Sequence, residues 1–170
     1  MNGNTQAPVP NYLKPIKISD LENIVMKLST RSRYGTRLVL DMARHYQQGP
    51  IQLGAIARRQ NISVKYLEQI IIPLKKSNYV TSVRGAKGGH LLAKAPEEIT
   101  VGEIVSLLEK DEGLTECAQH PEVCERSQAC VTRLLWKETC EAMHERLNAI
   151  TLADLLKLTE ANDAYDDASG

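Results

Sequence analysis

Two short helical patterns separated by a tight turn most constrain how this chain of 170 residues can fold. Their apolar positions recur at the spacing of one helix face, as Leu53, Ile56 and Ala57 and then as Leu67, Ile70, Ile71 and Leu74. The intervening Asn61-Ile62-Ser63 is typical of a turn, and Ser63 is suited to be the N-cap of the second helix. The pattern predicts a helix-turn-helix.

A glycine-rich basic segment follows the second helix. The β-rich residues 79–83 and the run His90-Leu91-Leu92 flank Arg84-Gly85-Ala86-Lys87-Gly88-Gly89. This arrangement predicts a β-hairpin with a basic tip. A helix-turn-helix followed by such a hairpin is a winged helix, so the predicted fold class is mainly α with a small β-hairpin wing. Glycines that merely close a hairpin remain an alternative.

Helical patterns also lie on both sides of this unit. The first is expected from Ser29 or Thr30 to about Tyr46, before the chain breaks at Gly49-Pro50. The second opens at the capping box Thr100-Val101-Gly102-Glu103 and continues to residue 108. The winged unit should therefore end near residue 110.

The whole chain divides into five expected segments. They are a loose, proline-containing N-terminal extension (1–25), a winged helix-turn-helix (26–110), a cysteine-containing loop (111–130), a long helix with a short C-terminal helix (131–158), and an acidic flexible tail (159–170). No apolar run approaches the ~20 residues of a membrane span, and no secretory signal is visible. We expect a cytoplasmic protein without a membrane partner.

The zero net charge hides a strong asymmetry. Residues 26–95 carry thirteen Lys and Arg side chains against only Asp41 and Glu68, whereas the following segment is acidic. Release of counterions makes nucleic acid the expected partner of such a basic segment. A solvated basic surface is the alternative.

The second helix of a helix-turn-helix enters the major groove of double-stranded DNA by its N-terminal turn, which here carries Lys65, Tyr66, Glu68 and Gln69. Gln69 could read adenine, and Glu68 could accept a hydrogen bond from cytosine or remain a solvated helix residue. In the wing, Arg84 beside Gly85 suits a minor groove, and Lys87 adds a second positive charge.

Three cysteines follow the basic part of the chain, at Cys117, Cys124 and Cys130, with Cys140 further on. In a reducing compartment, cysteines are more often ligands or redox groups than disulfides. The absence of a CxxC pair disfavours zinc, while an iron-sulfur cluster tolerates wider spacing. Three unrelated structural cysteines are the remaining alternative.

A cluster normally takes four ligands, and the fourth is not evident. Cys140 lies ~15 Å along a helix from Cys130. Other nearby groups are typical solvated loop residues: Glu116, His120, Glu122 and Glu125. A partner subunit could also supply the ligand.

Residues 131–150 predict a helix of about five turns with a broad apolar face. Two-fold pairing through this helix would form a homodimer and place two heads on a palindromic operator. Packing of the helix on its own head is the alternative.

Several motifs together resemble the IscR and NsrR type of bacterial winged-helix transcription regulators over residues 26–156. They are Met26-Lys27-Leu28-Ser29, Arg33-Tyr34-Gly35, Tyr66-Leu67-Glu68-Gln69, Ser82-Val83-Arg84-Gly85, Gly88-Gly89, Val101-Gly102-Glu103, the three loop cysteines and Ile150-Thr151-Leu152. The resemblance implies a dimer whose DNA affinity is switched by an iron-sulfur cluster. It also implies regulated genes for cluster assembly, iron supply, cysteine supply or nitric oxide stress.

Carried over by residue, the resemblance assigns base reading to Glu68 and Gln69 with Lys65, minor-groove contact to Arg84, and cluster ligation to the three loop cysteines. The chain departs from the family in three places. The first cysteine gap is one residue longer than usual, Arg133 stands where IscR has a histidine ligand, and Arg33 stands where NsrR-type members can supply an aspartate. An arginine stays protonated and cannot be a ligand.

The sequence thus predicts a homodimeric transcription regulator, not an enzyme, with a two-iron or four-iron cluster. The alternative is a winged-helix regulator without a cluster, controlled by its thiols or by a protein partner, for example in cysteine metabolism. No set of nucleophile, base and orienting residue is visible for catalysis.

Overall fold

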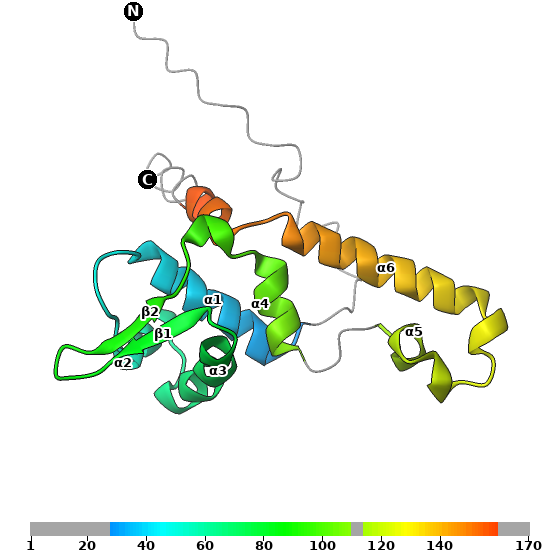
Figure 1. Cartoon of the computed structure of the whole chain (residues 1–170), viewed down its shortest axis with the longest axis horizontal. Helices are drawn as coiled ribbons and strands as arrows, with labels where there is room; N and C mark the ends of the chain where they lie inside the picture. Colours follow the sequence, from blue (N-terminus) through cyan, green and yellow to red (C-terminus); the bar gives the residue numbers. More distant parts are fainter. Residues whose placement is uncertain (1–27, 110–113, 160–170) are drawn as a thin grey trace, which may run out of the picture.

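The computed structural model describes residues 28–109 and 114–159 (Figure 1). The expected N-terminal extension and nearly all of the expected acidic tail lie outside these residues. The described part is mostly helical with one two-stranded sheet, and it confirms the predicted winged-helix fold class. None of its helices is long and apolar enough to cross a membrane.

Helix α1 (Thr30–Arg44) begins at the expected N-cap and ends two residues earlier than the sequence predicts. The Ser29 side chain accepts a hydrogen bond from the Ser32 backbone N–H at 3.1 Å. The backbone N–H of Ser29 in turn donates a hydrogen bond to Glu109 Oε1 at 2.8 Å. The start of α1 is thus tied to the C-cap of helix α4 (Val101–Leu108), 80 residues away.

Helices α2 (Leu53–Gln60) and α3 (Val64–Lys76) form the predicted helix-turn-helix. Asn61 adopts a left-handed conformation at the turn, with φ of 51°, which Asn tolerates better than most residues. The Ser63 side chain then accepts from the Tyr66 backbone N–H at 3.2 Å. The turn and the cap therefore follow the chemistry that the sequence predicts.

The wing consists of β1 (Val80–Val83) and β2 (Gly89–Leu92), paired antiparallel with Val80 opposite Leu92. Ile51, just before α2, exchanges two backbone hydrogen bonds with His90 of β2, at 2.9 and 2.8 Å. A Cβ on Gly89 would collide with the backbone of Ile51. Glycine is needed there because the strand and the α1–α2 connection approach so closely.

The core of the head is shared by the helices and the sheet. Its largest fully buried side chains include Leu38, Met42, Ile56, Leu67, Ile70, Leu74, Ile99, Ile104, Leu108 and Leu152. Gly35 allows α1 to cross α4 (Val101–Leu108) closely, since a Cβ there would collide with the Leu108 side chain. The predicted capping box of α4 is confirmed, with reciprocal hydrogen bonds between Thr100 and Glu103.

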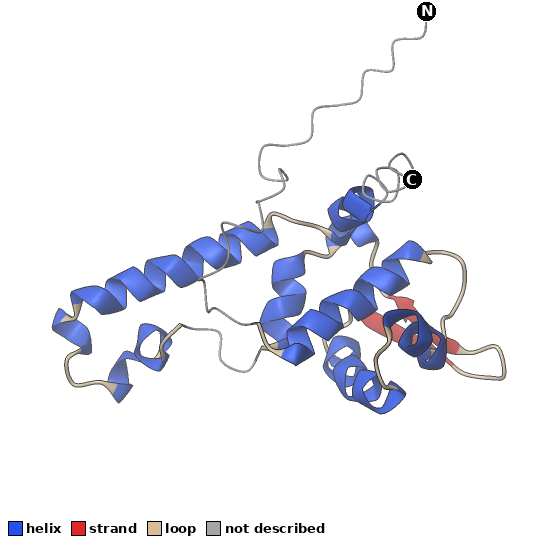
Figure 2. Ribbon diagram, turned by 180° about the vertical axis from the view of Figure 1, so that it is seen from behind, coloured by secondary structure: helices blue, strands red, loops and turns tan. Residues whose placement is uncertain are grey.

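The remaining described chain leaves the head and returns to it. After the short helical turn η3 (Pro96–Glu98) and α4, the cysteine segment forms α5 (Glu116–Gln119), η4 (Pro121–Val123) and η5 (Ser127–Ala129). Helix α6 (Val131–Asn148) then runs back to the head (Figure 2), and residues 152–159 form a final helix next to the η3 turn that precedes α4 (Figure 1). The sequence predicts a plain loop over 111–130, whereas the described part contains these short turns.

Only one end of α6 is docked on the head. Its last residue, Asn148, packs against Gly102 of α4, and the Val101 N–H donates to the Ile150 carbonyl at 2.8 Å. The Leu152 N–H donates to the Ile99 carbonyl at 2.9 Å. The other end of α6 projects away from the head with α5 beside it (Figure 1).

Candidate nucleic-acid interface and cysteine loop

Three of the predicted base-reading side chains share an exposed ridge of α3. Lys65, Glu68 and Gln69 are all exposed, and their spacing places them on one face near the start of the helix. Tyr66 differs, because it is half-buried and its ring meets the Tyr34 ring edge-on at a centroid distance of 5.8 Å. The structure thus leaves three polar side chains free for contact and orients the fourth through α1.

A polar chain of contacts continues from Tyr34 to the turn of the helix-turn-helix. The Arg37 guanidinium lies over the Tyr34 ring, 5.5 Å from its centroid. Arg37 Nε donates to the Gln60 side-chain oxygen at 3.1 Å, and its Nη2 donates to the Gln60 carbonyl. Gln60 Nε2 in turn donates to Asp41 Oδ2 at 2.9 Å. These contacts fix α1 against the last residue of α2.

Asp41 is the charged group at the centre of this arrangement, with only 2% of its surface exposed. Arg59 binds both of its oxygens, at 3.0 Å from Nε and 2.5 Å from Nη2. Burial by itself would raise the pKa of Asp41, but the hydrogen bonds from Arg59 and Gln60 outweigh it and hold the pKa below its ordinary value. A buried carboxylate thus joins α1 to α2.

The wing presents its two predicted cations to solvent. Arg84 and Lys87 are exposed, and Gly85 between them has a φ of 112°, which favours glycine. A Cβ on Gly88 would collide with the carbonyl oxygen of Val83, so this glycine is required for the tip to close. The conformation of the tip is therefore sterically defined, and Arg84 and Lys87 lie within it on either side of Gly85.

His90 lies on β2 opposite Ser82, one pair of residues from the tip of the wing. Its Nδ1 lies 3.2 Å from the Ser82 hydroxyl across the hairpin. Burial, with a contribution from the positive charge of Lys75, lowers the pKa of His90 below its ordinary value. His90 therefore favours the neutral form in the folded wing.

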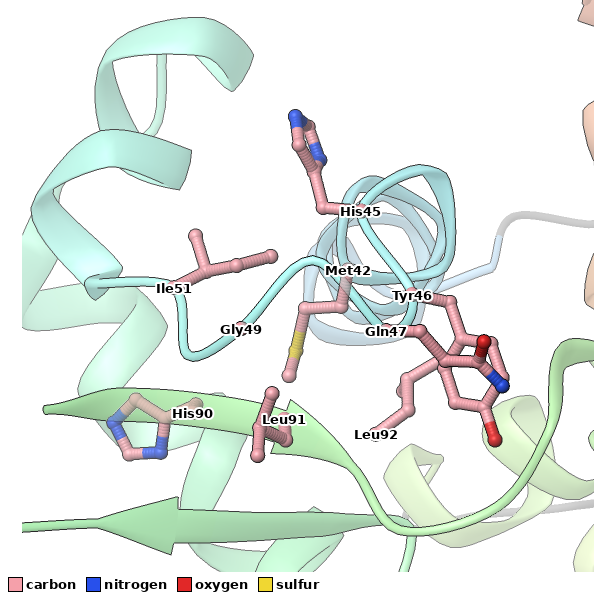
Figure 3. A pocket seen from close by; sticks show the side chains of 9 residues that line it. All are labelled: Met42, His45, Tyr46, Gln47, Gly49, Ile51, His90, Leu91 and Leu92. Atoms are coloured by element: carbon pink, nitrogen blue, oxygen red, sulfur yellow. The ribbon is translucent and has the colours of Figure 1, made fainter.

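A cavity of about 200 Å³ lies beneath the wing, between the end of α1, the connection to α2, and β2 (Figure 3). Figure 3 shows Met42 directed from α1 toward β2, while His45 points away from that strand. The cavity is lined mainly by apolar groups, and its lining pairs no nucleophile with a base. The lining residues are Met42, His45, Tyr46, Gln47, Gly49, Ile51, His90, Leu91 and Leu92. We interpret it as part of the packing that carries the wing.

The three predicted ligand cysteines lie on the segment beside α6, and all are free thiols of intermediate burial. Cys117 belongs to α5, Cys124 follows η4, and Cys130 is the N-cap of α6. Within residues 28–109 and 114–159, no three His, Cys, Asp or Glu side chains converge closely enough to hold a metal ion. The structure therefore gathers the cysteines on one segment without closing a ligand set.

Cys130 has the most perturbed environment of these thiols. Its Sγ lies 3.2 Å from the Thr132 hydroxyl. That hydrogen bond, with a further one from the Arg133 backbone N–H, holds the pKa of Cys130 below its ordinary value. A larger thiolate fraction favours both metal ligation and oxidation.

Two contacts that sequence reasoning missed hold the cysteine segment on α6. Arg133 Nε donates to the Cys117 carbonyl at 2.8 Å, and the Leu114 N–H donates to Cys140 Sγ at 3.3 Å. Cys140, which the sequence left without a role, is 7% exposed. Pro121 was the one sequence signal for the Arg133 contact: a proline has no N–H, so the carbonyl of Cys117, four residues earlier, needs a donor from elsewhere.

The projecting part of α6 leaves a row of large apolar side chains exposed. Val131 is 77% exposed, and Leu134, Leu135 and Trp136 are between 38% and 53% exposed. The sole buried residue of α6 is Cys140. The last part of α6 does pack on its own head, because Asn148 lies against Gly102 and His144 Nδ1 lies 3.3 Å from the Ser106 hydroxyl of α4, whereas the exposed apolar side chains lie toward the other end of α6.

The helix-turn-helix, its exposed polar ridge and its basic wing define a winged-helix DNA-binding protein. Comparison with known families agrees with this class. The model of the Rrf2 family, described as an iron-dependent transcriptional regulator, matches residues 28–158. The chain belongs to the Rrf2 family of transcriptional regulators.

Similar proteins include an Rrf2 protein, an IscR protein and a cysteine regulator. Protein rrf2 of Nitratidesulfovibrio vulgaris is 49% identical over 132 residues, which cover 78% of this chain and 88% of the relative. The structure of T. potens IscR superposes with a TM-score of 0.67 at 38% identity, covering 81% of this chain and 91% of that one. CymR of B. subtilis, described as the global cysteine regulator, gives a TM-score of 0.65 at 36% identity, with coverage of 78% and 98%.

Proposed function

We propose that this chain is a homodimeric regulator whose affinity for a palindromic operator is controlled by an iron-sulfur cluster at Cys117, Cys124 and Cys130. The observation that carries the proposal is the link between the two candidate sites. Helix α6 begins at the cysteine segment and ends against α4 of the DNA-binding head. A change at the thiols can therefore reach the heads through one rigid element.

Base reading is assigned to the exposed ridge of α3. Gln69 can make two hydrogen bonds to adenine and Glu68 can accept one from cytosine, while Lys65 can bind a base or a phosphate; each good contact discriminates by ~1 to 3 kcal/mol. Tyr66 belongs to the same surface as a side chain oriented by Tyr34. In the wing, Arg84 and Lys87 flank the backbone turn at Gly85 and would follow an adjacent minor groove.

Cluster binding is supported by the chemistry of the donors. Thiolates are the usual ligands of iron-sulfur clusters, and all three thiols are free and partly accessible. The segment would have to tighten for three sulfurs to share one centre, because they do not converge among the described residues. When bound, the cluster would supply a centre that responds to oxidation or to nitric oxide.

Dimer formation is assigned to the exposed row on α6. Val131, Leu134 and Leu135 are exposed and lie on one face of α6 at helical spacing, and Trp136 is exposed on the neighbouring face. Pairing two copies about a two-fold axis would cover this surface and present two recognition helices to a palindrome.

The proposal is tested by purifying the protein without oxygen and recording its visible absorption before and after air. We expect a sulfur-to-iron charge-transfer band that Cys124→Ala abolishes and that Cys140→Ser retains, since Cys140 lies outside the proposed ligand set. The shape of the band distinguishes two-iron from four-iron clusters. A colourless wild-type protein with no bound iron or sulfide would contradict the cluster.

A second candidate is a regulator that responds through its thiols or a protein partner without a cluster. Two observations favour it: the likeness to the global cysteine regulator CymR and the lowered pKa of the Cys130 thiol. In that case, iron and sulfide would be absent, and oxidation of Cys117, Cys124 or Cys130 would still change operator affinity.

A further inference from the structure

We propose that Arg133 is a positioning residue that closes the cysteine segment onto α6 and places Cys117 beside Cys130. The inference concerns the regulation of the same site and rests on the proposed function for the importance of these thiols. Its geometry requires no cluster, since it concerns only contacts of the polypeptide.

The first step is the carbonyl that Arg133 binds. In a helix, the Cys117 carbonyl would accept from the N–H of residue 121, but that residue is Pro121, which has none. The neighbouring Glu116 carbonyl is satisfied by the His120 N–H at 2.8 Å. Arg133 Nε supplies the missing donor to Cys117 at 2.8 Å. The proline therefore frees an acceptor that the arginine binds.

A second contact fixes the direction of the segment. Cys140 lies seven residues after Arg133, hence ~10 Å along the same face of α6. Leu114 is bound to Cys140, and Cys117, three residues later in the chain, is bound to Arg133, seven residues earlier on α6. The segment 114–117 therefore lies along α6 in the antiparallel direction.

This arrangement determines where the thiols lie. Cys130 is the N-cap of α6 and stands three residues before Arg133. A bond from Arg133 to the Cys117 backbone therefore brings the first and third cysteines to the same end of the helix. Cys124 lies on the chain that connects Cys117 to Cys130. The Arg133–Cys117 contact joins the two ends of this chain into a loop, and all three thiols lie on that loop.

The test measures alkylation of each cysteine in reduced, cluster-free, full-length protein by iodoacetamide and mass spectrometry. We expect Arg133→Gln to speed alkylation of Cys117 about tenfold, because a hydrogen bond from a charged donor shifts a local opening equilibrium by roughly that factor. Arg133→Lys should recover part of the protection. The matched control is Arg126→Gln, which removes an exposed arginine of the same segment and should change the rate less than twofold.

The alkylation rate of Cys140 distinguishes the loss of the Arg133–Cys117 contact from a general loosening of the arm. It should stay unchanged in Arg133→Gln, together with the helix content by circular dichroism. Equal Cys117 rates in wild type and Arg133→Gln would overturn the assignment, as would an equal gain at Cys140.

A second variant tests the same contact from the other side. Pro121→Ala restores an N–H that can compete for the Cys117 carbonyl, so Arg133→Gln should have a smaller effect in that background. An undiminished effect would contradict the role of the carbonyl. Because every rate is measured without a cluster, failure of the cluster proposal would leave these results unchanged and separately interpretable.

Discussion

The DNA-binding head and the projecting arm, which consists of α6 and the cysteine segment, differ in how far their apolar side chains are buried. In the head, Leu38, Ile56 and Leu67 are fully buried within one shared core. In α6, an 18-residue helix, Cys140 alone is buried, and Leu134 and Leu135 remain more than half exposed. The head is stable through its own packing, whereas the arm presents a surface that another molecule can cover.

The polar contacts differ in the same way. The head contains a buried carboxylate, Asp41, bound by Arg59 and Gln60 from another helix. On the arm, an ion pair between Lys137 and Glu141 is exposed, lies within one helix and spans 3.6 Å. Such a surface pair contributes little to stability. A rigid reading head and an adjustable arm suit a protein in which one part binds and the other responds.

The largest effect is expected from the core of the head. Leu67→Ala should lower the free energy of unfolding by about 3 kcal/mol, because it removes a fully buried side chain and leaves a cavity. Chemical denaturation measures the loss. Leu134→Ala on the arm is the matched control and should cost far less when measured at low protein concentration, which disfavours any pairing through α6. Equal losses would show that the two regions are packed alike.

The buried carboxylate should give the next largest effect. Asp41→Asn should cost about 2 kcal/mol at neutral pH, because Arg59 loses its charged partner, and Arg59 is itself partly exposed, which limits the loss. The folded pKa of Asp41 lies below its unfolded value, so its contribution is complete above about pH 4 and is lost as the pH falls through the folded pKa.

Denaturation curves measured at several pH values check this prediction. Wild type should lose stability toward acid more steeply than Asp41→Asn, and Glu141→Gln on the arm should behave as wild type. A variant with the same acid dependence as wild type would show that Asp41 is not the group responsible.

A smaller effect is expected on DNA binding. Gln69→Ala should weaken operator binding by about 1.5 kcal/mol and relax base preference at one position, because a bidentate contact is lost. Binding to unrelated DNA and thermal stability should not change. Gln119→Ala provides a control glutamine on the arm. Operator affinity equal to wild type would remove Gln69 from the reading surface.

The smallest effect concerns the exposed row on α6. Leu135→Ser should weaken self-association by about 1 kcal/mol, because the side chain would be only partly buried in a pair of helices. Sedimentation equilibrium measures the dissociation constant, and Lys137→Ser is a control on the same helix. A monomeric wild-type protein at all concentrations would contradict the use of this surface for pairing.

Local sequence signals predicted the helix-turn-helix, its caps and the wing because those features depend on near neighbours. Ser63 caps α3 by a hydrogen bond three residues away, and Thr100 and Glu103 form their capping box over the same separation. The glycines of the wing were predicted from the turn that they permit. Residues 1–27, 110–113 and 160–170 lie outside what the structure describes.

The missed features all join residues distant in the sequence. Asp41 meets Arg59 across two helices, Ile51 pairs with His90, and Arg133 binds the Cys117 carbonyl. The sequence of a helix does not show which distant residue will pair with a charged side chain such as Asp41. A contact to a backbone carbonyl leaves no trace in the sequence either, because every residue has that group.

The most direct test of cluster control is operator affinity measured on one protein before and after cluster removal, at constant salt. We expect wild type to change affinity at least fivefold on cluster loss and to recover when the cluster is rebuilt, a typical size for coupling between two sites. Cys124→Ala should stay at the cluster-free affinity throughout, and Cys140→Ser should respond as wild type. Identical affinities with and without the cluster would contradict its role as the switch.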